Sequence, residues 1–289
     1  MKVTIIGAAG KMGTWFTRYF VEKGNEVSIF DLNYNKAEEI AKEFNIKNTV
    51  NMISVIKEAD IILVAVPIDI TSEIVARVSK SVKKGAIIVE IASFKEKIIN
   101  ALKKIMENNV VFLSIHPMFG PGAKNLSNSK IIVVTEMDSE KEVKIAKKVF
   151  PEANVVSSSA KEHDEAMAII LSFTHFINVT YASILSSKDL KSLRRLSGTT
   201  FNLQLTLTES ILHDDPEFLT ALLLENKYAE KEIRQLVNVT NSLGNLALQN
   251  EQEKLKSTLR TLRRTMEKDK GYPTAYQKMY KMIDILLEK

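Results

Sequence analysis

His116 has the side chain best suited to proton transfer near neutral pH, and its surroundings should hold the ring still. It follows the β-branched run at residues 110–115 and opens the sequence His-Pro-Met-Phe-Gly-Pro-Gly. An imidazole with a pKa near 6.5 can accept or share a proton at pH 7. At the carboxyl end of a buried strand, this ring could take the proton of a substrate hydroxyl while hydride leaves the same carbon. The alternative is a structural histidine bonded to a loop carbonyl.

The hydroxyl of Ser93 is expected at the same edge of the sheet. The apolar run at residues 86–91 is followed by Ala-Ser-Phe-Lys at 92–95. Parallel strands end at one edge, and open α/β sheets bind ligands there. Ser93 is therefore a candidate for a catalytic role beside His116. The alternative is that Ser93 only caps the next helix.

A glycine-rich turn near the start of the chain predicts a dinucleotide site. Three glycines in the spacing Gly-x-x-Gly-x-x-Gly allow a tight turn, and free N–H groups at the following helix start can bind a pyrophosphate. Asp31 ends the next strand about 20 residues on, where a carboxylate bonds the adenosine ribose and repels a 2′-phosphate. NAD is thus favoured over NADP. The alternative is that the glycines only pack helix against strand and Asp31 is a cap. The predicted cofactor residues here are Gly7, Ala8, Ala9, Gly10, Lys11, Met12, Gly13 and Asp31.

Further cofactor contacts are expected from neighbouring strand ends. Val66 and Pro67 close the buried run at residues 61–66, where proline would stop the strand and turn the chain over the cofactor. The alternative for Pro67 is an ordinary strand terminator. Ser93 and Met118 complete the predicted cofactor-binding set.

The composition excludes several other chemistries. The 289 residues include no cysteine, so disulfides, thiolate nucleophiles and cysteine-ligated metals are excluded. Four scattered histidines without HExxH spacing predict no metal site. The net charge is +5, but lysines and glutamates mix along helical stretches, which is typical of a solvated surface rather than a nucleic-acid interface. No run approaches the roughly 18 apolar residues of a membrane helix, and no signal peptide is recognisable, which predicts a cytoplasmic protein without membrane contact.

An α/β domain must position these residues. Up to Ser157, short β-branched runs alternate with helix-period segments, which predicts a Rossmann-type, doubly wound and mostly parallel sheet over residues 1–157. The expected strands are 2–6, 26–30, 61–66, 86–91, 110–115, 130–135 and one near Val155, and the expected helices between the early strands are 12–23, 36–44 and 71–81.

The remainder, residues 158–289, predicts an all-helical domain. The helix expected at 162–186 is apolar nearly all round, so its surface must be covered by a compact bundle or by a second copy of the chain. The expected helices are 162–186, 190–212, 216–250, 251–268 and 274–288.

Four segments together resemble the prephenate dehydrogenases of tyrosine biosynthesis. They are Ile-His-Pro-Met-Phe-Gly-Pro at 115–121, Ala-Ser-Phe-Lys at 92–95, Glu-His-Asp at 162–164 and Phe-Thr-His-Phe at 173–176. The resemblance covers nearly the whole chain. It implies that residues 158–289 form a substrate and dimerisation domain, so we favour a homodimer over a compact monomeric bundle. It also implies the oxidative decarboxylation of prephenate to 4-hydroxyphenylpyruvate with NAD as hydride acceptor. An arogenate or other hydroxy-acid dehydrogenase and a non-catalytic NAD-binding regulator remain alternatives.

The resemblance also implies roles for single residues. His116 would bond the substrate's ring hydroxyl and help to withdraw its proton, and Ser93 would contact the same hydroxyl. His175 would lie in the substrate pocket, and Ser172 is expected to bind substrate with it. We interpret the Glu-His-Asp segment at 162–164 as the start of a helix, with a capping rather than a chemical role.

One departure from the family pattern concerns the substrate carboxylate. The family places an arginine six residues before the proline of an Asp-Pro pair. In this chain that pair is Asp215-Pro216, and the residue six positions before Pro216 is Ser210. A dianionic substrate requires a cation, preferably a bidentate one. The nearest substitutes are Arg194, Arg195 and Lys95. The alternative for each is a solvated helix face.

Overall fold

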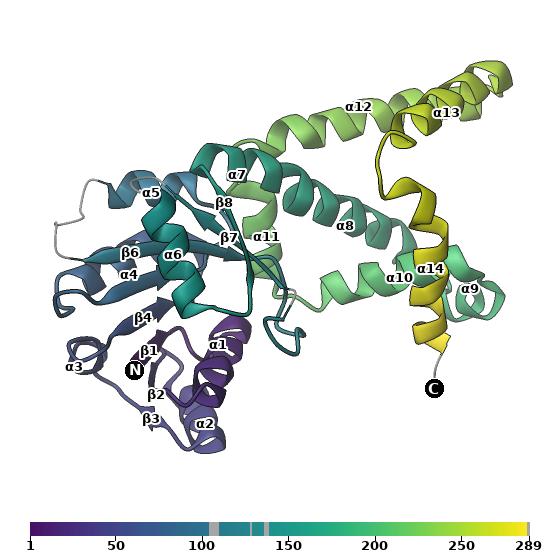
Figure 1. The fold of residues 1–289 in the computed structure, drawn as a ribbon. Helices are drawn as coiled ribbons and strands as arrows, with labels where there is room; N and C mark the ends of the chain where they lie inside the picture. Colours follow the sequence, from purple (N-terminus) through teal and green to yellow (C-terminus); the bar gives the residue numbers. More distant parts are fainter. Residues whose placement is uncertain (104–109, 128, 136–138, 288–289) are drawn as a thin grey trace. The chain divides into compact units, whose positions relative to one another are not determined.

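The chain forms two compact units, Met1–Met167 and Ala168–Lys289 (Figure 1). The computed structural model describes residues 1–103, 110–127, 129–135 and 139–287. The first unit includes helix α7 (Ala160–Met167), which we expected in the second domain. The reason is tertiary: the carboxylate of Asp164 on α7 accepts the backbone N–H groups of Lys95 and Glu96 at the start of α5 (Glu96–Leu102).

One sheet of eight strands organises the first unit, in the order β3-β2-β1-β4-β5-β6-β7-β8. All neighbouring strands run parallel except β6 and β7, which are antiparallel. The strands are β1 (Lys2–Ile6), β2 (Glu26–Phe30), β3 (Lys47–Asn48), β4 (Ile61–Val64), β5 (Ile87–Glu90), β6 (Val111–Pro117), β7 (Lys130–Val134) and β8 (Asn154–Ser158).

Helices cover both faces of this sheet (Figure 1). Successive strand residues point to opposite faces, so Ile5 and Leu63 pack with Phe16 of α1, while Ile62 and Ile88 contribute to a separate core on the other face. The predicted fold class, a Rossmann-type, mostly parallel sheet followed by an all-helical region, is confirmed. The remaining helices of this unit are α1 (Lys11–Glu22), α2 (Tyr34–Phe44), α3 (Met52–Ile56), α4 (Ile68–Ser79) and α6 (Ser139–Val149).

Four predicted strand ends differ from the structure, those of β5 and β7 by one residue and those of β4 and β6 by two. Strand β6 continues to Pro117, so His116 lies within the strand rather than after it. The cause is β7, which pairs His116 with Ile132 and Pro117 with Ile131. Strand β4 ends at Val64, because the chain turns at Pro67 into α4.

All the regular elements of the second unit, among its described residues, are helices. A π-helical segment, η1 (Ala168–Phe173), interrupts the helix predicted at 162–186, and Gly198 divides the one predicted at 190–212. Residues 225–228 divide the helix predicted at 216–250. The predicted end at Glu288 lies outside the described residues. The elements are η1, α8 (Thr174–Leu185), α9 (Leu190–Leu196), α10 (Thr199–Leu212), α11 (Pro216–Leu224), α12 (Ala229–Leu248), α13 (Gln252–Met266) and α14 (Tyr272–Leu287).

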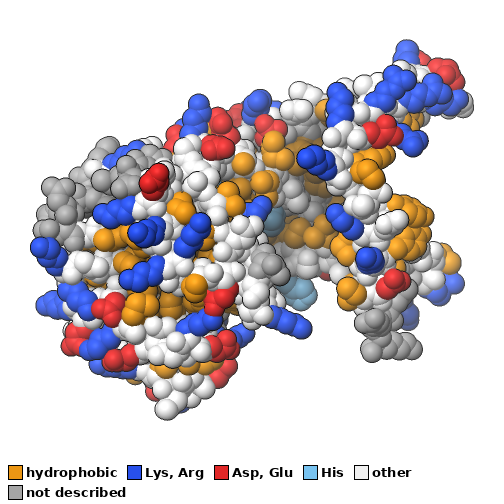
Figure 2. All heavy atoms as spheres, viewed as in Figure 1, with side chains coloured by type: hydrophobic (Ala, Val, Ile, Leu, Met, Phe, Trp, Pro, Cys, Tyr) orange, Lys and Arg blue, Asp and Glu red, His pale blue; other side chains and the backbone are white. Residues whose placement is uncertain are grey.

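Apolar side chains are exposed along these helices (Figure 2). By length and composition alone, the run Ala160–Leu185 could cross a membrane: an 18-residue window has a hydropathy of 1.6, and 22% of it is buried. The run also carries His175 and Asn178, whose polar atoms bond within the same unit.

Candidate active site

The carboxyl ends of five strands meet in one row of the first unit. The register aligns Ile6 with Phe30 and Val64, Val64 with Glu90, and Glu90 with Ser114. The glycine turn, Asp31, Val66-Pro67, Ser93 and His116 therefore all follow or end strands at the same edge, as the sequence predicts. This edge is where ligands bind in open α/β sheets.

At two positions of the turn, the neighbouring backbone leaves no space for any residue larger than glycine. Gly7 has a φ of +83°, and a Cβ there would overlap the carbonyl of Ala65. A Cβ on Gly13 would overlap the carbonyl oxygen of Gly7. For these two glycines, close packing of α1 on β1 and β4 is sufficient explanation, as the alternative interpretation holds.

Close packing of α1 on the sheet does not explain the third glycine, Gly10. It is exposed at the N-cap of α1 with a φ of −73°, and a Cβ would lie 3.4 Å from Gly7 O, an ordinary contact. Nothing within the described chain requires glycine here. An open helix start without a side chain is the arrangement that lets a pyrophosphate approach backbone N–H groups. The turn therefore fits a dinucleotide. Ala8 and Ala9 are buried in it, Met12 is half-buried against the core, and Lys11 is exposed.

The carboxylate of Asp31 holds the turn from the end of β2. Its Oδ2 accepts the N–H of Ala9 at 2.9 Å, and its Oδ1 accepts the N–H of Asn33 at 2.8 Å. Asp31 thus orders the turn, in addition to the ribose contact that the sequence predicts for it. A carboxylate has further lone pairs for such a contact.

The other predicted cofactor residues lie at the ends of β4, β5 and β6. Val66 is half-buried, Pro67 is exposed as the N-cap of α4, and Ser93 is buried. Met118 is half-buried, and its N–H donates to Lys130 O at 2.9 Å. No hydrogen bond joins Ser93 to His116 among the residues that the structure describes, so the two are neighbours at one edge rather than a bonded pair.

His116 is the first member of a buried hydrogen-bonded chain. Its Nδ1 lies 2.9 Å from Nε2 of His163, and Nδ1 of His163 lies 2.7 Å from Oδ1 of Asp164. Both histidines are buried, and His116 as a whole residue is only 6% exposed. Every buried side-chain nitrogen and oxygen of the described residues has a partner, and none is seen for Nε2 of His116. That nitrogen is therefore the accessible part of the ring.

Burial keeps both imidazoles neutral. Burial lowers the pKa of His116 well below its ordinary value, and the neighbouring His163 and the Lys95 ammonium lower it further. Burial also lowers the pKa of His163, and the hydrogen bond to Asp164 opposes that shift. A neutral imidazole at a strand end can accept a proton, which is the property that the sequence predicts for His116.

The sequence prediction missed His163. We interpreted residues 162–164 as the start of their own helix, but Asp164 caps α5 and His163 pairs with a ring 47 residues earlier. A histidine directly before an aspartate, on the buried side of a helix that follows the last strand, was the available signal.

Lys95 does not offer a cation to a ligand, so its predicted role in substrate binding is wrong. Its side chain is fully buried, and its ammonium donates to Glu90 Oε1 at 2.7 Å and to Ile115 O at 2.6 Å. The Glu90 carboxylate also accepts the hydroxyl of Ser114 and the N–H of Ala92. This buried pair ties β5 to the end of β6, directly beside His116.

The predicted substrate residues of the second unit differ in availability. Ser172 is fully buried and donates its hydroxyl to Leu222 O at 2.6 Å, so the prediction that it binds substrate is wrong. His175 is half-buried, and its Nδ1 donates to Leu171 O at 2.8 Å, which leaves Nε2 as an acceptor. Arg194 is exposed and paired with Glu209, and Arg195 is exposed.

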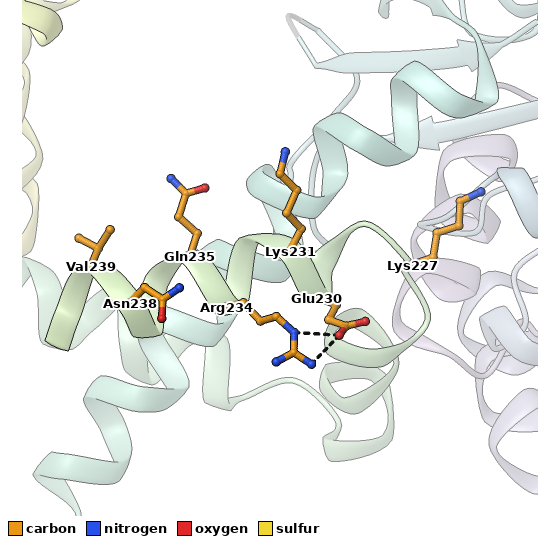
Figure 3. Close-up of a pocket in the computed structure, with 7 residues that line it drawn as sticks. All are labelled: Lys227, Glu230, Lys231, Arg234, Gln235, Asn238 and Val239. Carbon is orange, nitrogen blue, oxygen red and sulfur yellow. Dashed lines mark hydrogen bonds and ion pairs between the residues drawn. The ribbon is translucent and has the colours of Figure 1, made fainter. Parts of the chain in front are cut away.

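One cavity of the second unit lies along α12 (Figure 3). Arg234 donates two hydrogen bonds to Glu230 there, at 2.9 and 2.7 Å, so its charge is balanced. The cavity contains none of the residues predicted for catalysis, and we assign no chemistry to it. It is lined by Lys227, Glu230, Lys231, Arg234, Gln235, Asn238 and Val239.

Comparison with known families identifies both parts of the chain. Residues 16–159 match the nucleotide-binding domain of prephenate dehydrogenase, and residues 159–261 match its dimerization domain. The chain belongs to the prephenate dehydrogenase family. The two matches meet within the turn before α7, and together they cover most of the chain.

Individual members of this family show the same relationship at low identity. The chain is 25% identical over 260 residues to a probable arogenate/prephenate dehydrogenase of Methanocaldococcus jannaschii, covering 88% of this chain and 58% of that protein. It is 26% identical to a probable NADP(+) prephenate dehydrogenase of Schizosaccharomyces pombe, covering 90% and 61%. The chain thus spans about three fifths of these curated relatives.

A solved structure shares the fold over nearly the whole length. The prephenate dehydrogenase of A. aeolicus, solved with hydroxyphenyl propionate and NAD+, superposes with a TM-score of 0.74 at 22% identity, covering 93% of this chain and 98% of that one. The arogenate dehydrogenase of Synechocystis gives a TM-score of 0.68 at 17% identity, covering 93% and 99%.

Proposed function

We propose that this protein is an NAD-dependent dehydrogenase that oxidises and decarboxylates prephenate to 4-hydroxyphenylpyruvate. The observation that carries the proposal is the accessible Nε2 of a buried, neutral His116 at the sheet edge that also bears the glycine turn. Family membership supplies the substrate class, because named relatives act on prephenate or arogenate.

The proposed reaction needs little covalent participation by the protein. A bound nicotinamide supplies the hydride acceptor for the carbinol carbon of the substrate ring. Nε2 of His116 accepts the proton of the ring hydroxyl, and Ser93 bonds the same hydroxyl and fixes its direction. Loss of the carboxylate from the opposite ring carbon and formation of the aromatic ring favour the products. Orientation and one polarised hydroxyl are therefore the main contributions of the chain.

NAD is the proposed cofactor, and Asp31 supports that choice. A carboxylate at the end of β2 repels a 2′-phosphate and can bond the ribose. The turn would hold the pyrophosphate at Gly10 and the start of α1. The A. aeolicus structure contains NAD+, whereas the S. pombe relative is named for NADP(+), so the preference requires measurement.

The helical unit is proposed to bind substrate and to form a homodimer. His175 presents Nε2 as an acceptor, and Arg195 is the exposed cation that we propose for a substrate carboxylate in place of the missing family arginine. Exposed apolar residues such as Ile184, Leu259 and Leu262 provide surface for a second copy, and a dimerization-domain match supports this. We place the enzyme in the cytoplasm, with the first unit as the dinucleotide domain.

One absorbance assay distinguishes the proposed function from two alternatives. Arogenate differs from prephenate by an amine in place of a keto group, and a relative is named for both substrates. A non-catalytic NAD-binding regulator is the other alternative, since Ser210 stands where the family has arginine. Reduced nicotinamide is followed by its absorbance with prephenate and with arogenate, each with NAD and NADP. Dinucleotide binding without turnover of either substrate would favour the regulator.

The assignment of His116 has its own test. His116→Asn should lower turnover by about 10²- to 10⁴-fold, because it removes the proton acceptor. The dissociation constant for NAD, measured by calorimetry, should not change. An unaltered rate in this variant would remove His116 from the mechanism.

A further inference from the structure

In the series Asp164–His163–His116, the hydrogen bonds determine which ring nitrogen carries a proton and which accepts one. Asp164 accepts the N–H groups of Lys95 and Glu96 as well as Nδ1 of His163, and a carboxylate only accepts. Nδ1 of His163 must therefore carry its proton. A neutral His163 then has an unprotonated Nε2, which can only accept from Nδ1 of His116. A neutral His116 in turn leaves Nε2 unprotonated.

We propose that His163 and Asp164 are positioning residues that act through His116, fixing its reactive tautomer and taking over the proton charge that His116 receives. This inference rests on the proposed function only for the identity of the hydroxyl that loses the proton. The arrangement itself consists of side chains from β6 and α7 within one unit.

The proton transfer balances without another reactant. The substrate O–H bond breaks, and its proton binds Nε2 of His116. The Nδ1–H bond of His116 then breaks, and that proton binds Nε2 of His163. His116 is neutral again in its other tautomer, His163 is cationic, and Asp164 remains an anion. The hydroxyl becomes a carbonyl as hydride leaves its carbon, and no further oxidant than the proposed NAD is required.

The surrounding charges favour His163 over His116 as the holder of the cation. His163 has the Asp164 carboxylate at 2.7 Å, and Glu90 also favours its charged form, while Lys95 opposes it. His116 has no carboxylate partner among the residues that the structure describes, and both Lys95 and a charged His163 oppose its protonation. A cation on His163 is thus compensated, whereas one on His116 is not.

Two conservative variants separate this role from a structural one. His163→Gln keeps a carbonyl that can accept from Nδ1 of His116, but it cannot take a proton. Asp164→Asn keeps an oxygen that can cap α5, but it lacks the negative charge. Glu165→Gln is the matched control, because Glu165 is the exposed neighbour of Asp164 and loses the same charge. The assays are the pH profile of kcat/KM, the plateau kcat, and NMR titration of the four imidazoles without substrate.

The expected result is a slower enzyme that stays active at lower pH. When the Asp164–His163–His116 series carries an extra proton, Nε2 of His116 is protonated and cannot accept the substrate proton. The acid limb of kcat/KM therefore reports the apparent pKa of the three coupled groups together. Without His163, or without the negative charge of Asp164, the remaining groups are protonated only at a lower pH. The acid limb of kcat/KM therefore shifts to lower pH. The plateau kcat should fall about 10²-fold in both variants and stay unchanged in Glu165→Gln. In NMR, His163 should be protonated before His116, and Asp164→Asn should lower its pKa.

Several results would overturn the inference. An acid limb that stays in place or moves up, an effect confined to KM, or protonation of His116 before His163 would each refute it. Because the NMR titration needs no turnover, it remains decisive even if the substrate is not prephenate. Absence of turnover in the wild-type protein would count against the proposed function and leave the titration result standing.

Discussion

Replacing Glu90 by glutamine should destabilise the first unit more than any exposed charge change. The Lys95 ammonium is fully buried and has Glu90 as its only carboxylate partner within hydrogen-bonding distance among the described residues. Removing one partner of such a pair costs about 3–5 kcal/mol, because an uncompensated charge remains buried. The glutamine amide must also place an NH2 group against either the Ala92 N–H or the Lys95 ammonium.

An exposed pair in the same unit gives the control. Lys83 and Asp60 approach to 2.6 Å, almost the same distance as Lys95 and Glu90, but their side chains are 43% and 40% exposed. Asp60→Asn should therefore cost about 1 kcal/mol or less. Each kcal/mol shifts the Tm of a domain of this size by roughly 2–4 °C, so Glu90→Gln should lower Tm by about 6–20 °C.

The assay is urea and thermal unfolding followed by the fluorescence of Trp15, the single tryptophan of the chain, which is buried in the first unit. Adding Lys95→Met to Glu90→Gln should restore most of the loss, since both charges are then absent. A cost for Glu90→Gln no larger than that for Asp60→Asn would refute the reasoning. So would a double variant less stable than Glu90→Gln alone.

The loss should also depend on pH. Burial lowers the pKa of Lys95 below its ordinary value, and Glu90 opposes that shift. In Glu90→Gln the folded pKa falls further, so the unfolded chain binds the proton more tightly than the folded one. Stability of the variant should therefore rise with pH toward the ordinary lysine pKa, and the destabilisation should be largest below the folded pKa.

Three further predictions concern the dinucleotide turn and the loop after His116. Gly10→Ala should leave Tm nearly unchanged but weaken NAD binding about tenfold by calorimetry, whereas Gly13→Ala should lower Tm because its Cβ overlaps Gly7. Asp31→Ala should reduce the preference for NAD over NADP, measured as the ratio of the two kcat/KM values; an unchanged ratio would leave Asp31 only its bond to Ala9. Trp15→Phe removes the 2.7 Å bond to Ala123 O and should cost about 1 kcal/mol in urea unfolding, which is followed by circular dichroism because this variant has no tryptophan.

The regular parts of the first unit follow from local sequence. Strands β1 and β2 match their predicted ranges, because each is a short β-branched run ending at a turn residue. The short elements β3 and α3 and the helices α5 and α6 were not predicted. Helix α5 has only seven residues, and its first backbone N–H groups are satisfied by Asp164, far along the chain. Helix α6 is mostly charged and buries only Ala146 and Val149.

The chemistry at the site was less predictable than its location. Strand ends and glycines place His116, Ser93 and the turn at one edge, because parallel strands must end together. Whether a polar residue is accessible or enclosed depends on tertiary neighbours. Lys95 follows Ser93 by two residues and was expected at a ligand, yet Glu90 and the Ile115 carbonyl enclose it. His163 joins the site only because α7 packs on α5.

The position of α7 bears on how this protein can be dissected. A fragment that ends at Ser157, where the strand pattern stops, would lack both the second ring and the carboxylate that secures the start of α5. It would retain the glycine turn and the ring of His116 but release that ring from its neighbour. A fragment that ends at Met167 keeps His116, His163 and Asp164 together. This longer boundary is the one to use when the dinucleotide half is expressed on its own.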